Sequence, residues 1–203
     1  MKLVCYQNHT IEQPALLVNG KIYCLTGLNK HFPATMNELL DKWSYYIPLL
    51  YAEEKAILRG QKDHVISFTP EQMQLMAPVP YPGSCRDGYA FRKHVAAARR
   101  NRNLEMIREF DQYPVFYFTN HRSIQGPGDI ICMPDHFEKL DYELEAAIVI
   151  CKKGRNIKAE EADDYIGGLM IMNDLSARTM QIEEMLLNLG PAKGKDFATA
   201  IGP

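Results

Sequence analysis

The chain has 203 residues, 46% of them apolar, and its 23 Lys and Arg nearly balance its 25 Asp and Glu to give a net charge of −2. These values are those of a folded globular protein of one or two domains, and they exclude a disordered or collagen-like chain. The near-neutral charge argues against a dedicated nucleic-acid or membrane-surface binder, because phosphate binding needs a basic excess. No apolar run reaches the roughly 18 residues of a transmembrane helix, and the N-terminus lacks the apolar core of a signal peptide.

The five cysteines, at positions 5, 24, 85, 132 and 151, are odd in number, and no two have the CxxC spacing. A disulfide framework or a structural zinc site is therefore not expected. Reduced thiols are typical of the cytoplasm, so we expect a cytoplasmic protein without a membrane or nucleic-acid partner.

Residues 1–76 are expected to form a small α+β region. Two apolar runs around Asn19-Gly20, in residues 15–25, predict a β-hairpin. Residues 35–60 predict one or two helices with a break at Pro48.

A stiff connector is predicted for residues 77–83, where three of seven residues are proline. The domain beyond it, residues 84–203, alternates segments of strand and helix character. We expect a helix at 89–110, a strand at 115–120, a type II turn at 126–129, a strand at 141–151, a short helix at 159–166, a strand at 168–174, a helix to about Leu187 and a loop at 188–197. This order predicts an α+β, β-rich fold rather than a regular parallel sheet.

Two glutamates begin the strand predicted at 141–151. Strand side chains alternate, so Glu143 and Glu145 share a face. A solvated face is the ordinary interpretation of such residues, but both faces of the remaining strand are apolar, which predicts a buried strand with two carboxylates at its mouth. Their repulsion and burial would be relieved by a hard divalent cation, and oxygen ligands favour magnesium, manganese or calcium over zinc.

Two aspartates and a histidine are further candidates for functional residues. Asp174 ends the apolar run 168–172, where it is either a functional carboxylate or the N-cap of the following helix. Asp87 is a candidate N-cap, and His94 lies two helical turns further on, as a pocket residue or as an ordinary exposed histidine. The basic residues around His94 form either a solvated face or an attraction for an anionic substrate; they are Arg92, Lys93, Arg99, Arg100 and Arg102.

Taken together, a series of motifs resembles the fumarylacetoacetate hydrolase family. In chain order they are RDGYAFRKH (86–94), PVFYF (114–118), GPGD (126–129), DYELE (141–145), IMNDLSAR (171–178) followed by Gln181, and GPAKGKDFAT (190–199). The resemblance implies a β-roll catalytic domain, a homodimer or larger assembly, and a bound magnesium, manganese or calcium ion. Family members continue well beyond this length, so we expect the catalytic domain to be incomplete at its C-terminus.

By position, the resemblance assigns a role to each matching residue. It implies that the metal is held by Asp87, Glu143, Glu145 and Asp174, with Lys195 and Thr199 adjacent to it. It implies that His94 is the general base, that Lys195 and Arg178 hold a carboxylate or developing oxyanion, and that substrate contacts come from Tyr89, Arg178 and Gln181.

The activity implied is hydrolysis of a carbon–carbon bond in a fumarylacetoacetate- or acylpyruvate-like 1,3-dicarbonyl substrate. The same chelated enolate would serve a decarboxylase, an isomerase or a dehydratase acting on 2-oxo acids. A third alternative is an inactive, truncated domain that acts as a binding or interaction protein.

Overall fold

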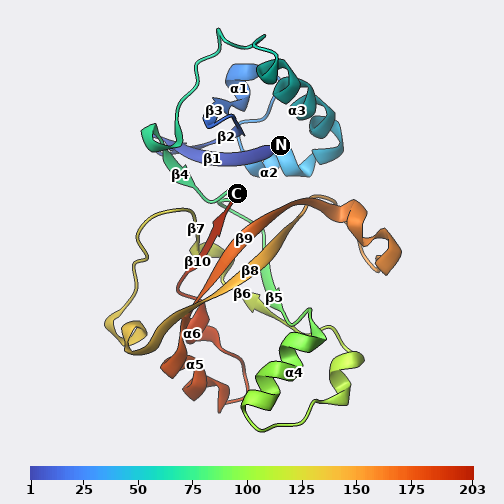
Figure 1. Ribbon diagram of the computed structural model, residues 1–203, viewed down its shortest axis with the longest axis vertical. Coiled ribbons are helices and arrows are strands. Elements are labelled where there is room, and N and C mark those ends of the chain that lie inside the picture. Colours follow the sequence, from blue (N-terminus) through green and yellow to red (C-terminus); the bar gives the residue numbers. More distant parts are fainter.

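The computed structural model of the chain has two parts, stacked one above the other in Figure 1. The smaller, N-terminal part contains an antiparallel sheet with strand order β3-β2-β1-β4. Its strands and helices are β1 (Lys2–Asn8), β2 (Ile11–Val18), β3 (Lys21–Cys24), α1 (Leu25–Leu28), α2 (Met36–Asp41), α3 (Trp43–Leu58), a 3-10 turn at Pro70–Gln72 and β4 (Gln74–Met76). The prediction of a hairpin is confirmed, because β2 and β3 pair across Asn19 and Gly20, whose φ angles are 50° and 74°.

The N-terminal core lies between this sheet and the helices. Leu16 on β2, Leu39 on α2 and Leu50 on α3 are fully buried in one cluster of 13 residues. Burial of such a leucine contributes about 1.5–3 kcal/mol, so this cluster stabilises the N-terminal part as a unit.

The predicted helix break at Pro48 is wrong. α2 and α3 are separated at Lys42, and Pro48 lies inside α3. Proline removes only the hydrogen bond to the carbonyl four residues earlier, that of Ser44. Ser44 and Pro48 are both exposed, so water can satisfy the freed carbonyl.

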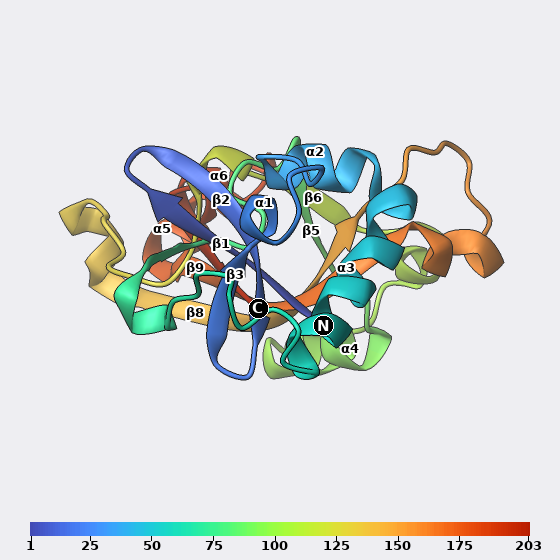
Figure 2. The ribbon, with the colours of Figure 1, turned by 90° about the horizontal axis from the view of Figure 1, so that it is seen from above.

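The larger part contains a four-stranded sheet with strand order β7-β10-β9-β8 and a two-stranded ribbon of β5 and β6. The elements are β5 (Cys85–Gly88), α4 (Arg92–Asn101), β6 (Phe116–Thr119), β7 (Ile124–Gln125), β8 (Leu140–Ile150), β9 (Ile166–Ala177), α5 (Arg178–Met185), α6 (Ala192–Lys195) and β10 (Thr199–Gly202), with 3-10 turns at Arg108–Asp111, His121–Ser123, Pro134–Lys139 and Ala159–Tyr165. The predicted α+β, β-rich fold is confirmed. Seen from above, the N-terminal part lies over the β8–β9 hairpin (Figure 2).

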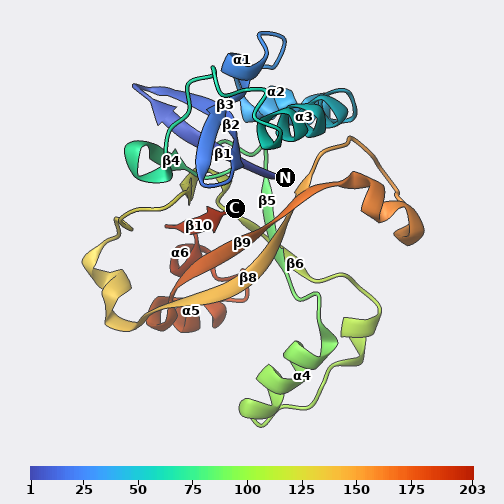
Figure 3. The same ribbon diagram turned by 45° about the horizontal axis from the view of Figure 1, so that its top comes forward.

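The helix predicted over residues 89–110 is too long. α4 ends after Asn101, and Asn103 adopts a left-handed φ of 55°, a conformation that terminates helices. Figure 3 shows α4 and the segment after it projecting from the ends of β5 and β6, away from the main sheet.

The long hairpin of β8 and β9 is buried on one face only. The opposite face exposes apolar side chains that share it, namely Tyr142, Leu144, Ile148, Leu169 and Ile171. The prediction of a strand buried on both faces is therefore wrong. Side-chain alternation determines which residues share a face, but not whether another element covers that face.

Two segments expected to lack helix or strand structure are residues 126–129 and 188–197. The predicted type II turn at 126–129 is an open bend without a backbone hydrogen bond across it, and Gly128 has a φ of 141°. The segment predicted as a loop at 188–197 contains the single-turn helix α6. Among the helices, none has the length and apolar character needed to cross a membrane.

Candidate functional site

Four carboxylates from three strands meet between the β5–β6 ribbon and the main sheet. Glu143 on β8 pairs directly with Asp174 on β9, and Glu145 follows two residues later on the same face. Asp87 approaches from β5. One oxygen or more of each residue lies within 4.8 Å of the others, so the four form a single cluster that could hold a metal ion.

Asp174 occupies the centre of this cluster and is only 1% exposed. Its Oδ2 accepts hydrogen bonds from Lys195 Nζ at 2.6 Å and from the Tyr117 hydroxyl at 2.8 Å, whereas its Oδ1 is buried without a partner. A buried carboxylate oxygen without a donor is costly, and a cation would satisfy it. An all-oxygen donor set with one orphaned oxygen therefore fits a hard divalent ion such as magnesium, manganese or calcium.

Asp174 is not the N-cap of the following helix. It lies inside β9, opposite Thr199 of β10 as well as Glu143. α5 begins only at Arg178, and Ala177 is its N-cap residue. The prediction that Asp87 caps a helix is also wrong, since Asp87 lies in β5 and Phe91 precedes α4.

The crowding of negative charge changes the acidity of the cluster. Burial, together with Asp87, Asp174 and Glu143, raises the pKa of Glu145 to about 7. Burial also raises the pKa of Asp174, against the effect of the Lys195 hydrogen bond. For Glu143, burial alone would raise the pKa, but hydrogen bonds from Lys195 and Arg178 outweigh it and the pKa is lowered. A proton and a cation therefore compete for Glu145 near neutral pH.

Lys195 is the buried cation of the site. Its side chain is 3% exposed, and its Nζ lies 2.6 Å from Asp174 Oδ2 and 2.9 Å from Glu143 Oε2. An ammonium at this depth is stable only because two carboxylates surround it.

Arg178 and Gln181 lie at the rim of the cluster, on the first turn of α5. The guanidinium donates to Glu143 Oε1 at 2.6 Å, to Gln181 Oε1 at 3.0 Å and to Asp141 Oδ2 at 3.0 Å. The structure therefore brings Arg178 and Gln181 together beside the carboxylates.

Tyr117 is a site residue that sequence reasoning missed. It lies opposite Asp87 in the β5–β6 ribbon, and its hydroxyl is 3.0 Å from Asp87 Oδ2 and 2.8 Å from Asp174 Oδ2. Burial and these two carboxylates raise its pKa, so the hydroxyl stays protonated as a donor. Alternation along the strand at 115–120 was the available signal, because Tyr117 faces inward between exposed Phe116 and Phe118.

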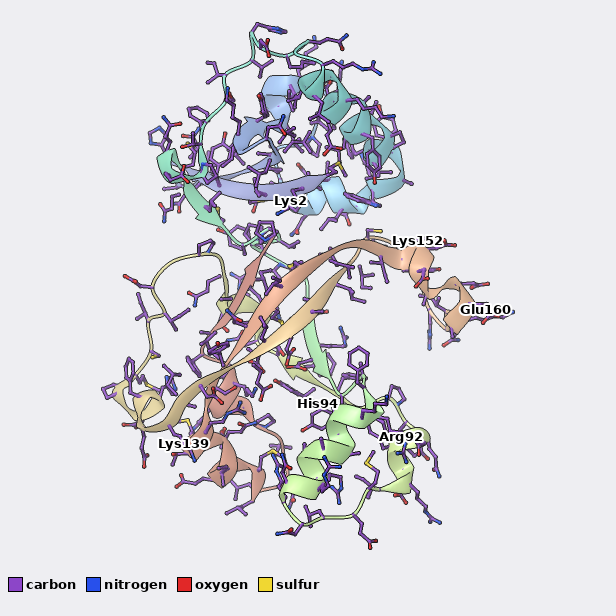
Figure 4. All side chains as sticks on the ribbon, in the orientation of Figure 1. Lys2, Arg92, His94, Lys139, Lys152 and Glu160 are labelled. Atoms are coloured by element: carbon purple, nitrogen blue, oxygen red, sulfur yellow. The ribbon has the colours of Figure 1, made fainter.

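Thr199 is fully buried beside Asp174, and its hydroxyl has no hydrogen-bond partner. His94 lies elsewhere, exposed on the first turn of α4 (Figure 4). Tyr89 is also exposed and precedes this helix. Their rings are 6.4 Å apart, and neither side chain makes a hydrogen bond to the carboxylate cluster. The structure thus assembles the carboxylates with Lys195, Thr199, Arg178 and Gln181, and it leaves His94 and Tyr89 on the projecting arm.

The chain is similar to known proteins both in sequence and in fold. Residues 84–203 match the sequence model of a family described as fumarylacetoacetate (FAA) hydrolase C-terminal. The chain is 29% identical over 190 residues to a mitochondrial oxaloacetate tautomerase of Xenopus laevis, covering 91% of this chain and 54% of that protein. It is 31% identical over 142 residues to an oxaloacetate tautomerase of Bacillus subtilis, covering 67% of this chain and 44% of that protein.

Among solved structures, a maleylpyruvate hydrolase from Sphingobium, crystallised with manganese(II) and pyruvate, has a similar fold. The TM-score is 0.66 at 17% identity, and the match covers 100% of this chain and 66% of the other. The chain spans about half of the length of the two curated tautomerases.

Proposed function

The chain belongs to the fumarylacetoacetate hydrolase family, and from this membership we propose that it is a divalent-metal-dependent enzyme acting on 2-oxo acids through an enolate. The observation that carries the proposal is the cluster of four carboxylates around the orphaned Oδ1 of Asp174. When bound there, magnesium or manganese supplies a Lewis acid that polarises a substrate carbonyl.

The residues of the chain supply the remaining parts of this chemistry. Lys195 provides a fixed positive charge beside Asp174 and Glu143, where it stabilises negative charge that develops on a substrate oxygen. Arg178 at the rim adds a second positive charge beside Glu143, which attracts an anionic substrate. Tyr117 lies with its hydroxyl between Asp87 and Asp174, and its one proton can be donated to either carboxylate.

The reaction we favour is keto–enol tautomerisation of an oxaloacetate-like 2-oxo diacid. One proton moves from the carbon beside the ketone to the ketone oxygen, and no carbon–carbon bond breaks. The support is that two oxaloacetate tautomerases, from a frog and from a bacterium, match 91% and 67% of this chain. A substrate carboxylate would also suit the positive charges of Arg178 and Lys195 in the site.

The test is the rate at which oxaloacetate approaches its keto–enol equilibrium, followed by the ultraviolet absorbance of the enol. Manganese-loaded protein is expected to accelerate this rate over buffer containing manganese alone. Glu143→Gln/Glu145→Gln is expected to abolish the acceleration, whereas Glu160→Gln/Glu161→Gln, which changes two exposed acids, retains it. A rate equal to that of manganese alone rejects tautomerisation.

A second candidate is hydrolysis of a carbon–carbon bond in an acylpyruvate-like substrate, and the match of residues 84–203 to a hydrolase family model supports it. His94 would take a proton from water, which attacks one carbonyl. The bond to the adjacent carbon then breaks, and its electron pair leaves as an enolate that is protonated to the 2-oxo acid. His94→Asn is expected to lower acylpyruvate hydrolysis by about 10²–10⁴-fold, while Lys93→Gln does not. Unchanged hydrolysis in His94→Asn assigns the base to another residue.

A further inference from the structure

The turn that carries Lys195 is attached to α5 by a single carboxylate. Glu184 Oε1 accepts the backbone N–H of Lys193 at 3.0 Å, and Oε2 accepts that of Gly194 at 2.8 Å. These are N–H groups of the first turn of α6, which an N-cap side chain normally satisfies. The N-cap residue of α6 is Pro191, which makes no side-chain cap, so Glu184 supplies the cap from another helix.

The backbone of this turn lies in close contact with α5. A Cβ atom on Gly194 would be 2.7 Å from Cα and N of Gln181, so only glycine permits this approach. On the other side of Lys195, the carbonyl of Asp196 accepts hydrogen bonds from Asn120 Nδ2 at 2.9 Å and Ser123 Oγ at 2.6 Å. The turn is therefore held on both sides, by Glu184 before Lys195 and by Asn120 and Ser123 after it.

The short helix α6, which carries Lys195, cannot hold its own conformation without contacts to other elements. A helix of one turn has no stability of its own, and a lysine side chain loses about 1.5–2 kcal/mol of conformational entropy on burial. We infer that Glu184 is a positioning residue that holds the Lys195 ammonium between Asp174 and Glu143. The inference rests on the proposed function for its catalytic meaning, because Lys195 is the charge that faces the developing oxyanion there.

The accessibility of the Lys195 amine tests the inference without metal or substrate. The full chain is treated with limiting acetic anhydride, and acetylation of Lys195 is measured by peptide mass spectrometry relative to Lys193. Lys193 is exposed and two residues away, so it serves as an internal reference. In the wild type, Lys195 is expected to react far more slowly than Lys193.

Glu184→Gln is expected to raise the Lys195-to-Lys193 ratio by about five- to tenfold, the factor that corresponds to a lost capping interaction, and Glu184→Ala by more. The melting temperature is expected to fall by no more than about 2–5 °C, the shift that corresponds to one lost cap in a chain of this size. The matched control is Glu183→Gln, because Glu183 is adjacent and exposed, whereas the hydrogen bonds to the α6 turn come from Glu184. A Lys195 ratio in both Glu184 variants equal to that of the wild type overturns the inference.

Hydrogen exchange of the wild type gives a second, independent measurement. The amides of Lys193 and Gly194 are expected to be protected compared with that of Leu189, which lies in the exposed loop before them. Equal exchange of all three amides overturns the inference even if a variant fails to fold. Neither measurement uses turnover, so failure of the tautomerase assay rejects the proposed function without affecting this result.

Discussion

At the scale of single residues, the site is defined by an imbalance of charge. Four carboxylates lie within one cluster, whereas only Lys195 and Arg178 place positive charge among them. The raised pKa of Glu145, caused first by burial and then by the neighbouring carboxylates, is the consequence of that imbalance. A divalent cation would neutralise this excess of negative charge. Metal binding and protonation of Glu145 therefore compete with each other.

The first prediction is that manganese stabilises the folded chain through these carboxylates. At a concentration 100 times its Kd, a ligand that binds only the folded state adds about 2.7 kcal/mol, which for a chain of this size corresponds to an increase in Tm of roughly 5–10 °C. Calorimetry with and without manganese measures this shift. Glu143→Gln/Glu145→Gln is expected to lose it and Glu160→Gln/Glu161→Gln to keep it. Equal shifts in all three proteins would reject the metal site.

The second prediction concerns pH in the presence of a chelator. The pKa of Glu145 is raised from 4.5 to about 7, so between these values the folded state binds more protons than the unfolded state. The contribution of Glu145 to stability is therefore complete below the lower value and is lost as pH rises through about 7. Tm is expected to fall across this range in the wild type and to fall less in Glu145→Gln. Parallel curves for the two proteins would show that Glu145 titrates normally.

The residues of the site differ in how far sequence reveals them. Glu143 and Glu145 are predictable as neighbours because strand alternation is local. Tyr117 was also accessible by alternation, but its partner Asp174 is 57 residues away and lies in another strand. Glu184 could not be predicted, since its two hydrogen bonds depend on how α5 meets a turn that looked like a loop.

Among helices and strands, the sequence predicts which neighbouring strands pair better than it predicts where a helix ends or whether a sheet face is covered. The hairpin at Asn19-Gly20 follows from two residues that accept positive φ. Helix α3 continues through Pro48 because an exposed carbonyl can bond to water, a condition that composition alone does not reveal. The face of β8 that carries Leu144 is apolar yet exposed, because coverage depends on distant elements.

The third prediction concerns the contact between Gly126, which follows β7, and the end of β4. A Cβ atom on Gly126 would lie 2.3 Å from the carbonyl carbon of Met76, so Gly126→Ala must displace backbone where the two parts of the chain meet. Overpacking costs about 1–3 kcal/mol, which lowers Tm by roughly 2–10 °C. Gly83→Ala is the matched control, because a Cβ there meets no atom within 4 Å. Equal Tm values for the two variants would contradict this packing.

At the scale of the whole molecule, the two parts are joined by small apolar contacts beside a large exposed face. Val149 and Met170 of the main sheet pack against the N-terminal core, while Ala77, Met172 and Ile201 form a separate cluster of three. The opposite face of the β8–β9 hairpin leaves Leu144 and Leu169 exposed by 71% and 73%. Contiguous apolar surface of this kind promotes association in water.

The fourth prediction is therefore that the chain associates through the outer face of β8 and β9. Sedimentation velocity is expected to show a mass that rises with protein concentration. Leu144→Glu/Leu169→Lys is expected to weaken association by at least tenfold, because burial of each leucine contributes about 1.5–3 kcal/mol. Its Tm, measured at the lowest concentration, is expected to change little, since both side chains are exposed in the single chain. Tyr51→Lys, which alters an exposed aromatic residue on α3, should associate as the wild type does. A monomer at all concentrations, or equal association of the leucine and tyrosine variants, would exclude this face as the contact surface.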